Sequence, residues 1–206
     1  MRFFKSAFFF LVFLLGACFV LIFSLKKENM QKEKQVEQFS VDALHYNLLK
    51  WNIEKHYEYE NTPIDDFEIT DNEDNTYLFS QLLNKKTSRY KFVFVFSSLN
   101  CNSCVDFEIS NIKSFSRLIG QDNIIILAQY ESIRQLRAFL STQDLTIPVY
   151  YVKNIPANVL EEENLPFSFI INKNLTLEMI FIPIKEIYSH TEMYYKTIYK
   201  RFFEDK

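Results

Sequence analysis

The sequence predicts an α/β domain with a central mixed sheet flanked by helices, behind an N-terminal apolar segment and a helical stalk. Continuous apolar runs at 92–96 and 124–128 predict buried strands, and each is followed by apolar residues at helical spacing. Such an alternation is typical of a parallel sheet covered on both faces. A turn between apolar runs at 167–171 and 175–182 predicts an antiparallel hairpin, which makes the sheet mixed.

The N-terminal segment predicts a membrane anchor. Residues 6–25 carry no charge and lie between Arg2 and Lys5 on one side and Lys26 and Lys27 on the other. As a helix, twenty residues span roughly 30 Å, the thickness of a bilayer's hydrocarbon core. We therefore assign 1–25 as a membrane anchor or signal segment.

Two other fates are open for this segment. Leu15–Cys18 resembles a lipoprotein cleavage box, although 19–23 stay apolar beyond it. A cleaved signal peptide needs a shorter apolar core and a small-residue cleavage site near its end, and the sequence around Ser24-Leu25-Lys26 does not supply one. An anchor or a lipid would tether the domain to a membrane. An N-terminal anchor before one globular domain normally leaves that domain outside the cytoplasm, in the periplasm or another extracytoplasmic space.

A stalk or linker at 26–60 joins this segment to the domain at 61–206. Residues 30–57 lack Gly and Pro, and their apolar side chains recur every three to four residues, which predicts an amphipathic helix. The helix either packs on the domain or binds a partner helix.

The elements of the domain follow from its apolar runs and turn residues. Asp71–Asn75 predicts a turn, and Glu161–Glu163 an exposed irregular segment. The predicted strands are 64–69, 77–79, 92–96, 124–128, 149–152, 167–171 and 175–182. The predicted helices are 105–118, 131–139 and 185–203.

The motif Cys101-Asn102-Ser103-Cys104 directly follows the strand predicted at 92–96. Two cysteines three residues apart at a strand-to-helix turn can close and reopen a tight disulfide, which favours redox chemistry. A zinc site or an Fe–S cluster needs more ligands than the chain places nearby, and haem attachment needs a His where Val105 stands. A static structural disulfide is the remaining alternative.

Composition limits the partners. The net charge is −3 and no basic stripe is present, which argues against a nucleic-acid-binding protein. We expect no metal and no cofactor. Only two glycines occur in the chain, so motifs that depend on glycine are eroded.

The order of elements, the Cys101–Cys104 motif and Leu165-Pro166-Phe167-Ser168 before a strand together resemble the thioredoxin-like superfamily. The resemblance is to membrane-tethered thiol–disulfide oxidoreductases of the TlpA/ResA type, within the wider group that includes peroxiredoxin-like proteins. It covers about 64–203 and implies a thioredoxin-like fold that acts on protein thiols and disulfides, together with a membrane or soluble redox partner.

The resemblance also implies roles for three residues. Cys101 would be the attacking thiolate, favoured at a helix N-terminus, and Cys104 the resolving thiol. Pro166 would follow a cis peptide bond and face the cysteines.

The chain departs from the family pattern close to the motif. It has Asn100 where an aromatic residue often precedes the first cysteine, and Val95 where a buried acid often lies. These departures leave two alternatives open: a non-catalytic thioredoxin-like binding module with a structural disulfide, and a thiol peroxidase in which Ser98 stands where a Thr is usual.

Overall fold

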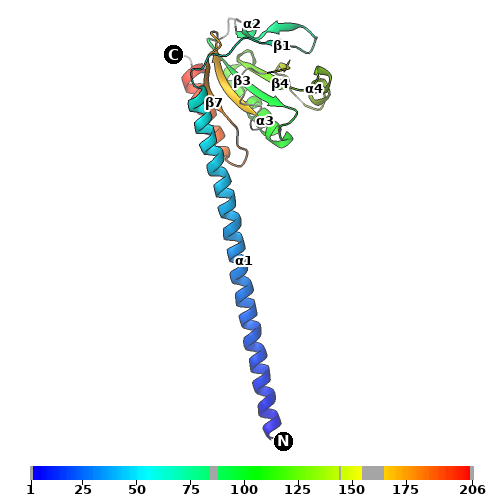
Figure 1. Ribbon diagram of the computed structural model, residues 1–206, viewed down its shortest axis with the longest axis vertical. Helices are drawn as coiled ribbons and strands as arrows, with labels where there is room; N and C mark the ends of the chain where they lie inside the picture. The colour runs from blue at the N-terminus through cyan, green and yellow to red at the C-terminus, as the bar shows by residue number, and fades with distance from the viewer. Residues whose placement is uncertain (1, 84–87, 144, 155–164, 205–206) are drawn as a thin grey trace. The chain divides into compact units, whose positions relative to one another are not determined.

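The computed structural model describes residues 2–83, 88–143, 145–154 and 165–204, with side chains from residue 19 onward. The chain divides into two compact units, residues 1–47 and 48–206. The helix α1 (Arg2–Tyr59) runs through the boundary, so it belongs to both units (Figure 1). The predicted domain boundaries near residues 25 and 60 remain predictions.

The first unit is helical throughout its described residues. The apolar side chains Val36, Phe39 and Leu44 of the predicted stalk are exposed. Within the second unit, Trp51 and Tyr59 of α1 pack on the core of the domain. Among the side chains that the structure describes, no helix offers a stretch long and apolar enough to cross a bilayer. Most of the predicted anchor at 6–25 lies outside those side chains, so it remains a prediction.

A mixed seven-stranded sheet forms the centre of the second unit, in the order β2-β1-β5-β4-β3-β6-β7. Neighbours β3, β4 and β5 are parallel, and every other pair is antiparallel. This arrangement confirms the predicted mixed sheet. The strands are β1 (Glu68–Thr70), β2 (Thr76–Leu78), β3 (Tyr90–Ser97), β4 (Ile124–Gln129), β5 (Val149–Val152), β6 (Phe167–Asn172) and β7 (Leu177–Phe181).

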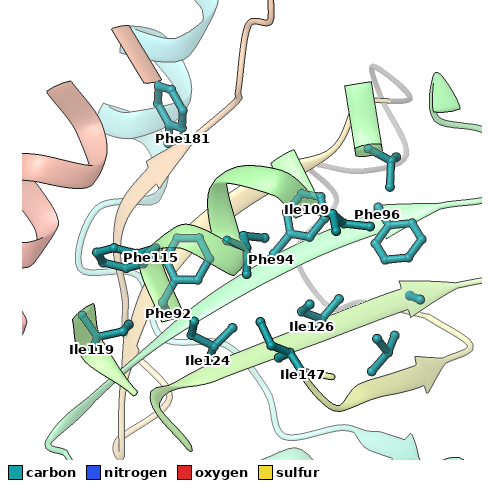
Figure 2. Close-up of a cluster of buried hydrophobic side chains, with 14 of the residues drawn as sticks. Phe92, Phe94, Phe96, Ile109, Phe115, Ile119, Ile124, Ile126, Ile147 and Phe181 are labelled. Carbon is teal, nitrogen blue, oxygen red and sulfur yellow. The ribbon is translucent and has the colours of Figure 1, made fainter. Parts of the chain in front are cut away.

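Alternation along the strands divides the core into two clusters, because successive side chains of a strand point to opposite faces. Val93 and Val95 of β3 lie in one cluster with α2 and the end of α1. Phe92, Phe94 and Phe96 lie in the other, against α3, α4 and α6 (Figure 2). The helices and turns are α2 (Phe79–Leu83), α3 (Asn102–Ile119), η1 (Gln121–Asn123), α4 (Ile133–Leu140), α6 (Tyr188–Ile198) and the π-helical turn η2 (Tyr199–Phe203).

Several predicted boundaries were wrong. The strand expected at 64–69 shortens to β1, and Phe79 starts the helix α2, whose buried Leu82 and Leu83 pack on the sheet. The strand expected from residue 175 begins at Leu177, because Leu175 has a φ of 58° and completes the hairpin turn where glycine would be usual.

The last predicted helix, 185–203, also starts late. Its first residue is Tyr188, with Ile187 as the N-cap, so residues 182–187 form a loop between β7 and α6. That loop contributes to the site described below. The segment predicted to be exposed at Glu161–Glu163 lies outside the described residues.

Candidate functional site

The turn between β3 and α3 is held by its own backbone and by one asparagine. The side-chain Oδ1 of Asn100 accepts a hydrogen bond from the Ser97 N–H at 2.7 Å, and the Asn100 N–H donates to the Ser97 carbonyl at 3.1 Å. The Ser98 N–H donates to the Gln129 carbonyl at the end of β4, at 3.0 Å. Asn100 is buried. An asparagine before the first cysteine therefore has a structural role here: it closes the turn that presents Cys101.

Cys101 is the N-cap of α3 and is exposed, whereas Cys104 lies in the first helical turn and is half-buried. The carbonyl of Cys101 accepts hydrogen bonds from the N–H groups of Cys104, at 2.9 Å, and of Val105, at 3.1 Å. Both cysteines carry free thiols. The helix thus starts three residues earlier than the predicted residue 105, and it places the Cys101 sulfur at the surface and the Cys104 sulfur partly inside.

The two thiols differ strongly in acidity. The hydrogen bond from the Ser103 hydroxyl, 3.1 Å from the Cys101 sulfur, is the main cause that lowers the pKa of Cys101 to about 7. Hydrogen bonds from Cys104 and the charge of Lys185 lower it further. Burial is the main cause that raises the pKa of Cys104 to about 11, followed by its interaction with Cys101. At neutral pH Cys101 is therefore the more readily ionised thiol of the pair.

Lys185 reaches this site from the loop between β7 and α6. Its Nζ donates to the Ser103 hydroxyl oxygen at 2.8 Å and lies 3.8 Å from the Glu186 carboxylate. The rings of Phe107 in α3 and Tyr188 in α6, which follow Ser103 and Lys185 by a few residues in their own segments, also contact each other, with centroids 6.3 Å apart. Sequence reasoning missed Lys185, because nothing in the pattern links residue 185 to residue 103.

A buried carboxyl lies one helical turn beyond Cys104. Glu108 is fully buried in α3, and its Oε1 accepts hydrogen bonds from Tyr195, at 2.6 Å, and Ser168, at 3.3 Å. Its Oε2 accepts from Asn111 at 3.3 Å. Burial raises the pKa of Glu108, although these hydrogen bonds oppose the shift.

The sequence did carry a signal for Glu108. The apolar face of α3 includes Val105, Ile109 and Ile112, and a residue at position 108 lies on that same face because it is three residues from Val105 and four from Ile112. An acid on the buried face of a helix is rare unless it is paired or hydrogen-bonded. Val95 of β3 does stand where an acid often lies in the family, and the buried acid of this chain lies instead in α3, at Glu108.

Pro166 is buried and directly precedes β6. The structure has no cis peptide bond among its described residues, so the prediction of a cis bond before Pro166 is wrong. A trans bond is the lower-energy isomer, and the chain enters the sheet directly after it, with Phe167 opposite Val95.

No metal site is evident in the described part of the chain: no three His, Cys, Asp or Glu side chains there are grouped to hold an ion.

The arrangement is similar to solved structures. It matches a proposed protein disulfide isomerase from Bacteroides thetaiotaomicron with a TM-score of 0.50 and 14% identity, over 71% of this chain and 91% of that chain. The chain has a thioredoxin-like fold. No known protein family matches the sequence. No characterised protein matches it either.

Two further structures give lower scores. One is a thiol:disulfide interchange protein from Bacteroides sp., with a TM-score of 0.48 and 10% identity, over 66% of this chain and 90% of that chain. The other is the pneumococcal exposed lipoprotein thioredoxin from Streptococcus pneumoniae, with a TM-score of 0.44 and 16% identity, over 64% of this chain and 99% of that chain.

Proposed function

We propose that the protein is a thiol–disulfide oxidoreductase whose dithiol is Cys101 and Cys104. The observation that carries this proposal is the asymmetry of the pair: an exposed thiol with a pKa of about 7 next to a half-buried thiol with a pKa of about 11. A structural disulfide has no need of an acidic, accessible sulfur. An exchange enzyme needs one, because the thiolate is the attacking species.

The reaction has two steps. The Cys101 thiolate attacks a disulfide of a protein substrate, forms a mixed disulfide, and releases one substrate thiolate. Cys104 then loses its proton and attacks the Cys101 sulfur, which closes the Cys101–Cys104 disulfide and releases the second substrate thiolate. The substrate disulfide has gained two electrons, and the dithiol of the enzyme has lost them. In the opposite direction the enzyme disulfide oxidises a substrate dithiol. A membrane or soluble redox partner restores the starting form.

The role expected of Pro166 depended on a cis bond, so the proposal does not include it. The two cysteines are sufficient for the electron balance.

Mixed-disulfide trapping tests the proposal. With Cys104→Ala, Cys101 still attacks but no thiol resolves the product, so mixed disulfides with substrate proteins should accumulate and appear on a non-reducing gel. With Cys101→Ala, the half-buried Cys104 should trap little. Both variants carry Cys18→Ser, so that the third cysteine of the chain contributes no band.

The proposal fails if neither variant traps a protein and the Cys101–Cys104 disulfide of the natural protein has a reduction potential below about −300 mV, which is the range of structural disulfides. A thioredoxin-like binding module would then replace the enzyme. Peroxide consumption that depends on Cys101 and a thiol reductant would instead favour the peroxidase.

We also propose that the N-terminal segment tethers this domain to a membrane on its extracytoplasmic side, because the charge-free stretch at 6–25 is long enough to span a bilayer. A reporter that is active only outside the cytoplasm, fused after Lys206, should be active. The fusion should also stay in the membrane fraction when Cys18 is replaced by Ser. Release of the Cys18→Ser variant from the membrane would replace the anchor with a lipid on that cysteine.

A further inference from the structure

Two consecutive side-chain hydrogen bonds connect Cys101 to a distant part of the sequence. The Cys101 sulfur lies 3.1 Å from the Ser103 hydroxyl oxygen, and that oxygen lies 2.8 Å from the Lys185 Nζ. Ser103 is one of the two residues between the cysteines, whereas Lys185 is 82 residues away from it, in the loop before α6. The loop before α6 therefore supplies Lys185, the last residue in this series of hydrogen bonds.

The direction of these hydrogen bonds follows from the chemistry of the three groups. An ammonium group has donors and no acceptor, so Ser103 must accept from Lys185. The single hydroxyl proton of Ser103 then stays available for Cys101. A thiolate has no proton to give, so in that form Cys101 must be the acceptor and Ser103 the donor. The hydrogen bond is charge-assisted only in the thiolate form.

We infer that Lys185 is a positioning residue for the exchange reaction: it orients the Ser103 hydroxyl toward Cys101 and thereby stabilises the attacking thiolate. This inference rests on the proposed oxidoreductase function. In the mixed disulfide and in the Cys101–Cys104 disulfide the sulfur carries no charge, so the contribution of Lys185 disappears from those states. Lys185 therefore favours the reduced enzyme over the oxidised one.

Other groups near the two sulfurs do not supply the same effect. The groups that act on Cys101 are Ser103 and Cys104 from its own helix and Lys185 from the loop. Glu186, the neighbour of Lys185, is the one carboxylate among the groups that act on Cys104, and its charge raises the pKa of that thiol. Lys185 is thus the cation among the main causes that act on each of the two thiols, and its charge lowers the pKa of both.

The test is the pH profile of Cys101 alkylation by iodoacetamide, measured on the full-length chain with Cys18→Ser and Cys104→Ala in every variant. Lys185→Met should raise the pKa of Cys101 by about half a unit and slow alkylation at pH 7 about two- to threefold. Ser103→Ala should slow it more, about five- to tenfold, because it removes the direct donor. Lys185→Arg retains the charge and the donors and should react at close to the unsubstituted rate.

Two comparisons separate the orienting role from simpler causes. In the Ser103→Ala variant, adding Lys185→Met should change the rate less than about 1.5-fold, because the orienting effect through Ser103 is already lost and only the direct effect of the Lys185 charge remains. Lys113→Met is the matched control. It removes a cation from α3, the helix that carries Cys104, at a point about 13 Å further along that helix, and it should leave the alkylation profile unchanged.

The inference is overturned if Lys185→Met leaves the alkylation profile unchanged or if Lys185→Arg behaves as Lys185→Met. It is also overturned if Lys185→Met slows alkylation by the same factor with Ser103 and with Ala at position 103. The last result would assign the effect to the charge alone. Trapping by Cys104→Ala together with an unchanged profile would reject the inference and leave the oxidoreductase intact. Absence of trapping would reject the proposed oxidoreductase function. The alkylation profile would still measure the effect of Lys185 and Ser103 on the pKa of Cys101.

Discussion

Replacing Glu108 with leucine is expected to lower the free energy of unfolding by about 1–3 kcal/mol for each hydroxyl that loses its acceptor. The two hydroxyls belong to Tyr195 and Ser168, which both donate to Oε1 of Glu108. Glu108→Gln has nearly the same shape and keeps an oxygen acceptor, so it should be much more stable than Glu108→Leu. Urea unfolding of the purified proteins at one pH measures the difference.

The same pair of variants makes a prediction about pH. Burial raises the pKa of Glu108 in the folded chain above its value in the unfolded chain. The folded state therefore binds this proton more tightly, and the resulting stability is complete below the unfolded pKa of about 4.3. It is lost as the pH rises from there through the folded pKa. The glutamine variant has no such proton, so it should gain stability relative to the natural protein as the pH is raised.

An exposed glutamate provides the control. Glu192 forms an exposed ion pair with Lys196, so Glu192→Leu and Glu192→Gln should each change stability by no more than about 0.5 kcal/mol. If Glu108→Leu proves as stable as Glu108→Gln, or if the difference between the glutamine variant and the natural protein is independent of pH, the buried network does not have the assigned role.

Replacing Asn52 with alanine is expected to cost about 2–4 kcal/mol of unfolding free energy. Asn52 is buried near the end of α1 and makes two hydrogen bonds to one residue that follows β7: its Nδ2 donates to the Ile182 carbonyl at 2.9 Å, and its Oδ1 accepts from the Ile182 N–H at 2.7 Å. Without this amide, both backbone groups lose their partner in a place that water reaches poorly.

Asn52→Asp separates the hydrogen bonds from the packing. The carboxylate has the same shape, but it cannot donate to the Ile182 carbonyl, and it places a negative oxygen against it. We expect this variant to be destabilised as well, whereas Asn29→Ala, on the exposed surface of α1, should unfold at the denaturant concentration of the natural protein. An aspartate variant as stable as the natural protein would show that the two hydrogen bonds contribute little. Guanidinium unfolding measures all three.

Much of the fold could be predicted from the sequence because its strongest signals are local. Strands such as β3 and β4 are continuous apolar runs, and α3 repeats its apolar residues at helical spacing, so neighbouring residues alone identify them. The short elements are different. The five residues of α2 and the three of β1 are too few for a period to show, and their type depends on what they pack against.

The cysteine pair could also be found by reading along the chain. Cys101 and Cys104 are three residues apart, and the apolar run before them predicts the turn that carries them. The partners that tune them could not be found in this way. Ser103 meets Lys185 across 82 residues, and Glu108 meets Tyr195 across 87, so no local pattern records either contact.

The sequence by itself therefore determined the class of fold, the order of the main strands and helices, and the location of the cysteine pair, because each depends on residues that are close along the chain. Only the tertiary structure decided which side chains lower the pKa of Cys101, which lysine lies close to that thiol, where the buried acid is, and that the bond before Pro166 is trans. Those properties depend on burial and on charges brought together by the sheet, and both arise only when distant segments pack.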